Sequence, residues 1–286
     1  MTLSRRTIAQ IIEPEPVIEG AGVRLKRSIG TPILDYLDPF LLFDDFTSGN
    51  PRDYEAGFPL HPHRGIETVT YVLEGEVRHK DTLGNAGSIT AGEIQWMTAG
   101  RGIMHEEMPQ VRPEGIVGFQ LWVNLPAKLK MMKPRYQDVR SSEIPEITRE
   151  NGARIRVITG TVEGMTGPVT GIAADPTYLD VFIPAHTPFS QPIVRGHTAF
   201  AHVFAGEARF QIEGGNERLI SHPHLVVFSD GDVVTVMTGT SSVRLLLVSG
   251  LPLGEPIARY GPFVMNTEQE IEQTLLEIRE GTFVTT

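Results

Sequence analysis

Hydrophobic residues fall in short runs along most of the chain, and glycine, proline or polar turn residues bound each run. The runs are rich in β-branched and aromatic residues, as β-strands are. Clear examples cover residues 67–82, 118–125 and 154–164, and the first is interrupted at Glu74-Gly75. Many short strands at this spacing predict a β-sandwich or a β-barrel. Further runs lie at 179–186, 199–214, 224–239 and 241–250.

The end of the chain has the period of a helix. Residues 266–281 read NTEQEIEQTLLEIREG, and Thr267 with Glu270 three residues later forms a capping box. Gly281 stands where the helix would end. The sequence therefore predicts one short C-terminal helix. Its apolar residues lie at i, i+4 and i+7 on one face: Ile271, Leu275 and Ile278.

The two halves of the chain show a weak internal repeat. Residues 69–78 (VTYVLEGEVR) align with 200–209 (FAHVFAGEAR), and residues 91–100 resemble 230–239. The segment between the halves concentrates basic residues and prolines and shows no clean strand pattern. We therefore expect two similar β units in tandem, joined by a linker near residues 134–148.

Composition narrows the possible functions. The chain has 286 residues, a net charge of −10 and no cysteine. The length allows one large or two moderate domains, and the negative charge argues against direct binding of nucleic acid. The lack of cysteine excludes disulfides, thiolate nucleophiles and sulfur ligands. Prolines and glutamates at 13–16 interrupt any signal-peptide core, and no run approaches the ~20 apolar residues of a membrane span. We expect a cytoplasmic protein with no membrane partner.

Two pairs of potential metal ligands lie in the first β unit. His61 and His63 are separated by one residue, as are His105 and Glu107. Because side chains two apart share one face of a strand, each pair can point at one ion, while Glu106 points the other way. Three imidazoles and one carboxylate suit a divalent first-row metal and leave positions open for water or substrate. The spacing alone also fits polar residues at strand ends, so both interpretations stay open.

Three stretches resemble the pirin family of bicupins: HPHRGIETVTYVLEG at 61–75, GEIQWMTAGRGIMHEEMP at 92–109 and GPFVMNT at 261–267. The resemblance runs from about residue 20 to 280. It implies an all-β fold of two tandem cupin β-barrels with a short C-terminal helix. It also implies a metal-binding cupin domain at 1–134, and a second cupin-like domain at 148–286 that lacks metal ligands and carries the helix.

The family's metal ligands carry over to four residues: His61, His63, His105 and Glu107. Iron(II) is the expected metal, and nickel, manganese, copper or zinc would also suit these ligands. The family usually has a small residue where this chain has Glu106, but strand alternation favours Glu107 as the ligand. Glu67 is the rival, since many other cupins use a glutamate placed like this; the pirin-like pattern gives it a supporting or structural role. His79 is expected to be a partly buried histidine with satisfied hydrogen bonds rather than a substrate contact.

The second half contains another His-x-His pair, formed by His222 and His224. We expect both to be surface or turn residues and the second unit to lack a metal site. In the alignment of the two units, the four ligand positions are occupied by Pro192, Val194, Arg244 and Leu246.

The resemblance also implies an activity. Similar proteins open the heterocyclic ring of flavonols such as quercetin in a 2,3-dioxygenase reaction, so a flat aromatic substrate and dioxygen are the expected partners. The metal would lower the pKa of the substrate's 3-hydroxyl group, and Glu107 would take the proton as general base. Other family members are regulators, so the alternative is a metal-dependent co-regulator that binds a protein partner without turnover. A sugar-isomerase-like or storage cupin is the third alternative, and the degenerate second unit speaks against it.

Overall fold

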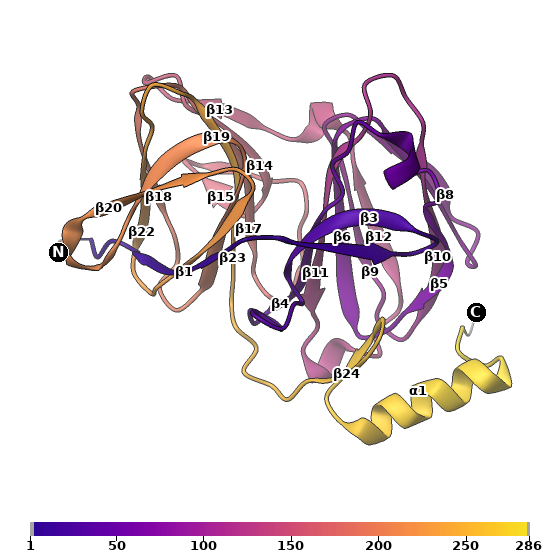
Figure 1. Cartoon of the computed structure of the whole chain (residues 1–286). Helices are drawn as coiled ribbons and strands as arrows, with labels where there is room; N and C mark the ends of the chain where they lie inside the picture. Colours follow the sequence, from indigo (N-terminus) through magenta and orange to yellow (C-terminus); the bar gives the residue numbers. More distant parts are fainter. Residues whose placement is uncertain (1–2, 285–286) are drawn as a thin grey trace. The chain divides into compact units, whose positions relative to one another are not determined.

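The computed structural model describes residues 3–284, which form two compact units. The first unit comprises Glu15–Ser141 and the C-terminal residues from Leu253 onward. The second comprises the N-terminal residues up to Pro14 and Ser142–Pro252. Strands dominate both units, and the single α-helix of the described residues lies near the C-terminus (Figure 1). The predicted all-β architecture of two units with one C-terminal helix is confirmed.

The first unit contains two antiparallel sheets, a short hairpin and a helix. Its strands are β2 (Glu15–Glu19), β3 (Val23–Ile29), β4 (Phe40–Asp45), β5 (Phe58–His63), β6 (Ile66–Glu74), β7 (Glu76–Asp81), β8 (Ala86–Thr90), β9 (Glu93–Thr98), β10 (Ile103–Gln110), β11 (Val117–Asn124), β12 (Arg135–Val139), β24 (Ala258–Tyr260) and β25 (Phe263–Met265). The large sheet has the order β12-β9-β6-β11-β4-β3-β2 and the small sheet the order β5-β10-β7-β8, while β24 pairs with β25. Its helices are η1 (Pro51–Asp53), η2 (Ala127–Leu129) and α1 (Glu268–Glu280).

The second unit is built on one branched sheet. Its strands are β1 (Ile8–Ile12), β13 (Glu146–Thr148), β14 (Arg154–Thr159), β15 (Thr161–Val162), β16 (Met165–Thr166), β17 (Thr177–Ile183), β18 (Pro188–Pro192), β19 (Thr198–Gln211), β20 (Glu217–Ser221), β21 (His224–Phe228), β22 (Val233–Met237) and β23 (Val243–Gly250). The main order is β1-β21-β19-β23-β17-β14-β13; β20 pairs with β19, and β22 pairs with β18 and β19. β15 and β16 form a separate hairpin. The 3₁₀ turns are η3 (Ser141–Glu143), where the chain passes between the units, and η4 (Glu213–Gly215).

Neither end of the chain belongs to the unit that the predicted domain boundaries, 1–134 and 148–286, assign to it. β1 pairs with β21 and so joins the second unit, although the sequence placed it in the domain 1–134. Figure 1 shows this indigo strand beside the orange strands. The helix α1 joins the first unit, not the domain 148–286. Periodicity shows which face of an element is apolar, but not which sheet covers that face. The buried face of α1 packs in one cluster with its neighbours: Phe263, Met265, Ile271, Leu275, Ile278 and Phe283.

The segment 134–148 is not a strand-free linker, which corrects a second expectation. β12 forms an edge of the large sheet beside β9, and β13 pairs with β14. Both are edge strands, and most of their side chains are at least partly exposed. Such strands need few apolar residues, so the hydrophobic pattern did not reveal them.

Strand pairing supports one internal repeat and rejects the other. Residues 69–78 cover β6 and β7, and residues 200–209 lie in β19, which takes the place of both strands. The resemblance of 91–100 to 230–239 is misleading, because β9 corresponds by its pairing to β21 and not to β22. By the same criterion β22 corresponds to β10, and β23 to β11. Arg244 and Leu246 of β23 are therefore not the counterparts of His105 and Glu107.

The ends of α1 agree with the sequence. The hydroxyl of Thr267 accepts from the backbone N–H of Glu270, whose carboxylate accepts from the N–H of Thr267 at 2.9 Å. Gly281 ends the helix with a left-handed φ of 71°, a conformation that glycine adopts without strain. The predicted capping box and terminating glycine are confirmed.

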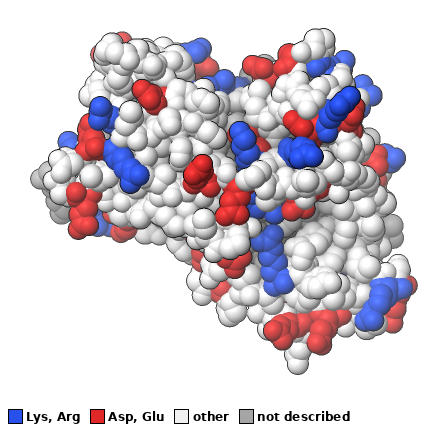
Figure 2. Space-filling model, in the orientation of Figure 1, with Lys and Arg blue, Asp and Glu red and all other residues white. Residues whose placement is uncertain are grey.

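Acidic and basic side chains are interspersed on the face shown in Figure 2, and acidic ones gather over α1 at the lower edge. Within residues 3–284 no helix combines the length and the apolar character needed to cross a membrane.

Candidate functional site

A cavity of about 530 Å³ lies inside the first unit. Because side chains alternate along a strand, Thr70 of β6 and Gln120 and Trp122 of β11 face this cavity. Most of its wall is apolar, so a ligand inside it would be largely shielded from water. The apolar wall includes Val23, Leu25, Leu42, Phe46, Tyr54, Phe58 and Val77.

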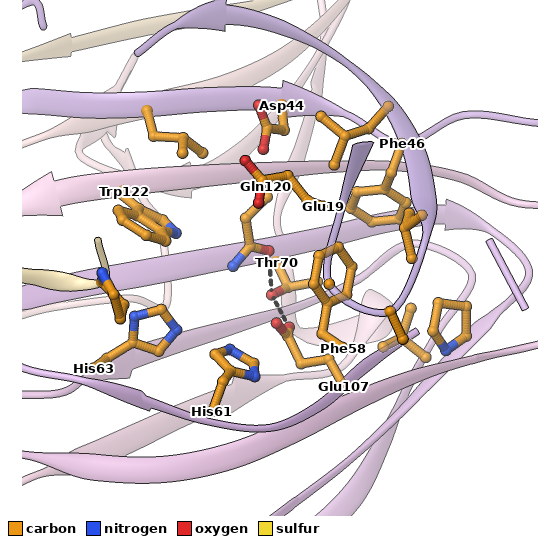
Figure 3. A pocket seen from close by; sticks show the side chains of 18 of the residues that line it. Glu19, Asp44, Phe46, Phe58, His61, His63, Thr70, Glu107, Gln120 and Trp122 are labelled. Atoms are coloured by element: carbon orange, nitrogen blue, oxygen red, sulfur yellow. Dashed lines mark hydrogen bonds between the residues drawn. The ribbon is translucent and has the colours of Figure 1, made fainter. Parts of the chain in front are cut away.

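The imidazoles and the charged groups of the cavity gather at two ends, and Thr70 and Gln120 lie between them. Figure 3 shows His61, His63 and Glu107 at one end. Toward the other end, Arg27 donates to both carboxylate oxygens of Asp44 at 2.8 and 2.7 Å, and to Glu19 at 2.8 Å. Burial raises the pKa of Asp44 to about 6, although Arg27 acts in the opposite direction. The cavity therefore combines a nitrogen-rich end with an ionic end.

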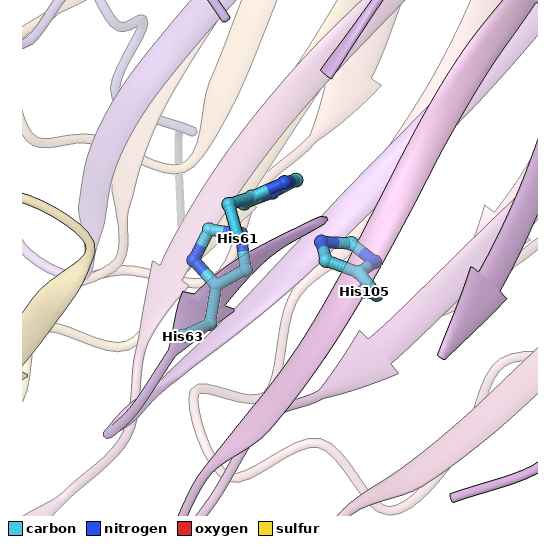
Figure 4. A group of neighbouring side chains, drawn as sticks. All are labelled: His61, His63 and His105. Carbon is cyan, nitrogen blue, oxygen red and sulfur yellow. The ribbon is translucent and has the colours of Figure 1, made fainter. Parts of the chain in front are cut away.

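Three histidines converge because β5 and β10 are antiparallel neighbours. His61 lies opposite His105, and His63 lies opposite Ile103. The centroid of the His105 ring is 4.5 Å from that of His61 and 5.1 Å from that of His63. Figure 4 shows the three rings facing one another. The register then shifts, so that Glu107 pairs with Phe58. The two predicted ligand pairs thus lie on paired strands.

The ring nitrogens form a set that suits a metal ion. Each ring offers one nitrogen, and these three atoms lie within 4.8 Å of one another. Nδ1 of His61 lies 2.9 Å from the carbonyl oxygen of Pro59, so a proton on Nδ1 leaves the Nε2 lone pair available. Both ring nitrogens of His105 and Nδ1 of His63 are buried without a hydrogen-bond partner. Such atoms are costly to bury, and a bound cation would satisfy one nitrogen of each ring.

The surroundings keep two of the rings neutral. Burial lowers the pKa of His105 to about 3, and the neighbouring rings of His61 and His79 add to this effect. Burial and the same kind of neighbours lower the pKa of His63 well below its usual value. A metal binds the neutral form of imidazole, so these side chains are ready to coordinate at pH 7.

Glu107 lies at the edge of the three-histidine group. Its Oε2 is 4.0 Å from Nε2 of His105, and its Oε1 accepts from the hydroxyl of Thr70 at 2.9 Å. The same hydroxyl lies 2.7 Å from the side-chain amide of Gln120. A hydroxyl has only one proton to donate, so a Gln120 amide turned to donate its N–H satisfies both contacts. Thr70 therefore occupies one carboxylate oxygen and leaves the other facing the histidines.

The other acidic candidates lie outside the group. Glu67 is on the face of β6 opposite to Thr70, is 1% exposed and accepts from the hydroxyl of Thr98 at 2.6 Å. Burial raises the pKa of Glu67 to about 6. Glu106 points away from the cavity and lies 3.4 Å from Nζ of Lys80. Strand alternation accounts for both placements.

His79 is buried beside the site rather than in it. Its Nε2 lies 2.9 Å from the side-chain nitrogen of Gln95, and its ring stacks on Tyr136 with centroids 5.9 Å apart. The predicted hydrogen bonding holds for this nitrogen alone, because Nδ1 is buried without a partner.

The histidine pair of the second unit lies apart from any such cluster. His222 is exposed in the turn before β21, and Nδ1 of His224 lies 2.8 Å from the carbonyl oxygen of Ser221. β22, the counterpart of β10, reads VVTVM and offers no imidazole or carboxylate. In the described part of the chain, the one group of metal-ligating side chains found is that of the first unit.

Several cavity residues were not singled out in the sequence. Thr70 and Gln120 sit in predicted strands, and alternation along β6 and β11 would have placed them on one face. Arg259 and Pro262 come from the C-terminal segment, and the guanidinium of Arg259 stacks 5.3 Å from the ring centroid of Trp122. The stretch around Pro262 belongs to a family motif, but spacing alone gave no sign that it reaches the first unit.

Comparison with known proteins agrees with this architecture. The family model described as "Pirin" matches residues 22–123, and the model described as "Pirin C-terminal cupin domain" matches residues 178–284.

Individual relatives match over most of their length. A "Pirin-like protein" of Caulobacter vibrioides is 43% identical over 97% of this chain and 99% of its own length. "Pirin" of Homo sapiens is 44% identical over 92% of this chain and 89% of its own. The crystal structure of a quercetin 2,3-dioxygenase from Acinetobacter baumannii superposes with a TM-score of 0.87 at 31% identity, covering 99% of both chains.

Proposed function

The chain belongs to the pirin family, and on this premise we propose that it is a metal-dependent dioxygenase that opens the ring of a flavonol such as quercetin. The observation that carries the proposal is the three-histidine group at one end of a wide, mostly apolar cavity. The similar structure from Acinetobacter baumannii is named for this activity, which supports a flavonol and dioxygen as reactants.

We assign the metal to His61, His63 and His105, with Oε2 of Glu107 as the fourth ligand. The unpartnered ring nitrogens and the neutral state of the rings support this set. Iron(II) is our preferred metal, although nickel, manganese, copper and zinc also suit nitrogen and oxygen ligands. When bound, the metal supplies a Lewis acid that lowers the pKa of the substrate's 3-hydroxyl group.

Glu107 is the proton acceptor in this proposal. Its carboxylate is anchored at Oε1 by Thr70, so Oε2, on loosening from the metal, would be the atom left to meet the 3-hydroxyl group of the substrate. Gln120 holds the hydroxyl of Thr70 and thereby fixes the direction in which it donates. A base held in place removes the proton without first having to reorient.

The remaining cavity suits the rest of a flavonol. Its volume of about 530 Å³ falls within the ~300–1,000 Å³ typical of small-molecule sites. The aromatic walls at Phe46 and Phe58 offer faces for a flat ring system. The ion pair of Arg27 with Asp44 offers charged partners for phenolic hydroxyl groups at the far end.

A metal-dependent regulator is the second candidate. It is favoured by the connection of the His63 backbone, through Arg64, to the surface helix α1. In that case the ion would change what the protein presents to a protein partner, without turnover of a small molecule.

Oxygen uptake separates the two candidates. Purified protein is stripped of metal, reloaded anaerobically with iron(II) and mixed with quercetin in an oxygen-electrode cell. The dioxygenase proposal predicts uptake that requires both iron and quercetin. Uptake no greater than that of the metal-free protein would remove the enzymatic proposal and leave the regulator.

A further inference from the structure

Arg64 directly follows His63 and is 3% exposed, although arginine is rarely buried without partners. Its Nη1 donates to the hydroxyl of Thr274 at 3.0 Å, and its Nη2 donates to Oε2 of Glu277 at 2.5 Å. Its Nε donates to the carbonyl oxygen of Arg101 at 2.6 Å. Thr274 and Glu277 lie on α1, so one side chain joins the His-Pro-His motif to the C-terminal helix.

The backbone after His63 is held by the same C-terminal segment. The N–H of Val264 donates to the carbonyl oxygen of Arg64 at 3.1 Å. Nζ of Lys130 donates to the carbonyl oxygens of both Gly65 and Val264, at 2.9 and 2.8 Å. A Cβ atom on Gly65 would lie 1.9 Å from the carbonyl oxygen of Val264, so only glycine permits this approach. The segment is therefore packed directly on the end of β5.

The segment also reaches the cavity. Pro262 lines the cavity near the histidines. Its carbonyl oxygen accepts from the backbone N–H of Arg64 at 3.4 Å. The residue that follows His63 is thus held both by its backbone and by its side chain.

α1 has an inner face that makes these contacts and an outer face in solvent. Ile271 and Thr274 are buried, whereas Glu268, Glu272 and Glu280 are exposed. Figure 2 shows the acidic side chains that gather over this helix. A change in the docking of α1 would therefore alter the surface that the protein exposes to solvent.

We propose that metal occupancy at His63 and the docking of α1 on the first unit are coupled through Arg64. The inference rests on the metal site of the proposed function and goes beyond it, because it names a surface element that responds to the ion. Arg64 acts here as a positioning residue and touches neither metal nor substrate.

The physical basis is the short path from Arg64 to the His63 ring. A metal site accepts only small errors in ligand position, and groups that orient ligands typically change metal affinity 10–100-fold when removed. When α1 leaves, the buried guanidinium loses Thr274 and Glu277, and the end of β5 keeps only its backbone contacts. Coupling of this kind is reciprocal: if docking strengthens metal binding by some factor, metal binding strengthens docking by the same factor.

The first test measures zinc affinity by competition with a chromophoric chelator, because zinc binds such ligands without redox chemistry. Arg64→Met is expected to weaken zinc binding about tenfold, the lower end of the range for orienting groups. Glu277→Gln, which keeps size and some hydrogen bonding, is expected to weaken it less. Glu272→Gln and Arg279→Gln alter exposed positions of the same helix and are expected to bind zinc like the wild type.

The second test uses the wild-type protein alone, so it does not depend on the folding of any variant. Hydrogen exchange of residues 268–280 is followed by mass spectrometry with and without zinc. Coupling predicts that zinc slows the exchange of these residues. The slowing should equal the factor by which Arg64→Met weakens zinc binding. It should disappear in Arg64→Met and in His61→Ala.

Two results would overturn the coupling. One is wild-type zinc affinity in both Arg64→Met and Glu277→Gln, and the other is α1 exchange that is the same with and without zinc. Failure of the proposed function gives a different result. If the coupling is observed but the protein takes up no dioxygen with iron(II) and quercetin, the coupling stands and the dioxygenase proposal fails.

Discussion

The hydroxyl of Thr70 donates to Oε1 of Glu107 at 2.9 Å across the cavity, from the large sheet to the small one. This bond turns Oε2 of Glu107 toward Nε2 of His105, 4.0 Å away. Oriented carboxylates of this kind are usually fixed by a neighbouring hydrogen bond. The placement of Glu107 therefore depends on a residue of another strand as well as on its own position in β10.

Removing that hydrogen bond should loosen Glu107. Thr70→Val keeps the shape of the side chain and loses the hydroxyl, so we expect metal affinity to fall about tenfold, the lower end of the effect of orienting groups, and turnover to fall with it. Thr70→Ser restores the hydroxyl and should recover most of both. Equal metal affinity in the valine and serine variants, measured by chelator competition, would show that the bond does not position Glu107.

Glu107→Gln separates the roles of ligand and base. The amide keeps an oxygen that can contact the ion but cannot accept the substrate's proton. We expect quercetin turnover to fall by ~10²–10⁴-fold, the usual contribution of a general base, and metal affinity to fall much less. Steady-state kinetics at matched metal occupancy measure the first quantity, and equilibrium dialysis measures the second. A variant that turns over normally when loaded would exclude Glu107 as the base.

The two His-x-His pairs offer a matched comparison. His61→Ala removes one of the three converging imidazoles, and we expect it to lose most of its metal while both β units stay folded, because neither core includes His61. His224→Ala changes the His-x-His pair of the second unit, and this variant should retain one metal per chain. Elemental analysis after dialysis measures the metal bound per chain, and circular dichroism is the folding control. Metal loss in the His224 variant alone would place the site in the second unit.

Burial of Glu67 should make the free energy of unfolding fall as the pH rises. Burial raises its pKa from 4.5 to about 6, so between these values the native state binds more protons than the unfolded chain and the free energy of unfolding falls as pH rises. Glu67→Gln removes this loss. A shift of this size corresponds to about 2 kcal/mol, so the variant should gain about that much on the wild type between pH 4 and pH 8.

Urea unfolding of the metal-free protein at the two pH values tests the Glu67 prediction. Glu74→Gln is the control, because it removes an exposed carboxylate at the end of the same strand. A Glu67→Gln variant whose stability relative to the wild type is independent of pH would contradict the assignment of a raised pKa to this side chain.

Much of the fold could be predicted from the sequence, because buried strands and the amphipathic helix carry strong local signals. The break at Gly75 and the capping box at Thr267 are local features and appear as expected. The pairing of β1 with β21 and the docking of α1 on the first unit are long-range choices that a local pattern does not encode. The edge strands β12 and β13 were missed because exposed edges need little apolar sequence.

The candidate site divides in the same way. The period of a strand was enough to place His61 and His63 on one face and to separate Glu107 from Glu106. The sequence could not show that Thr70 would reach Glu107, because that contact joins two sheets. Nor could it show that Arg64 would reach Glu277, a residue 213 positions later in the chain.

The measurement that tests the central claim most directly is the release of carbon monoxide from quercetin, compared between the iron(II)-loaded wild type and His61→Ala. Ring opening by dioxygen at the site of His61, His63, His105 and Glu107 predicts one carbon monoxide for each dioxygen consumed, in proportion to bound iron, and a rate in His61→Ala no greater than that of free iron(II). Wild-type protein with one iron per chain that releases no carbon monoxide, or a His61→Ala variant that releases it at the wild-type rate, would contradict the account.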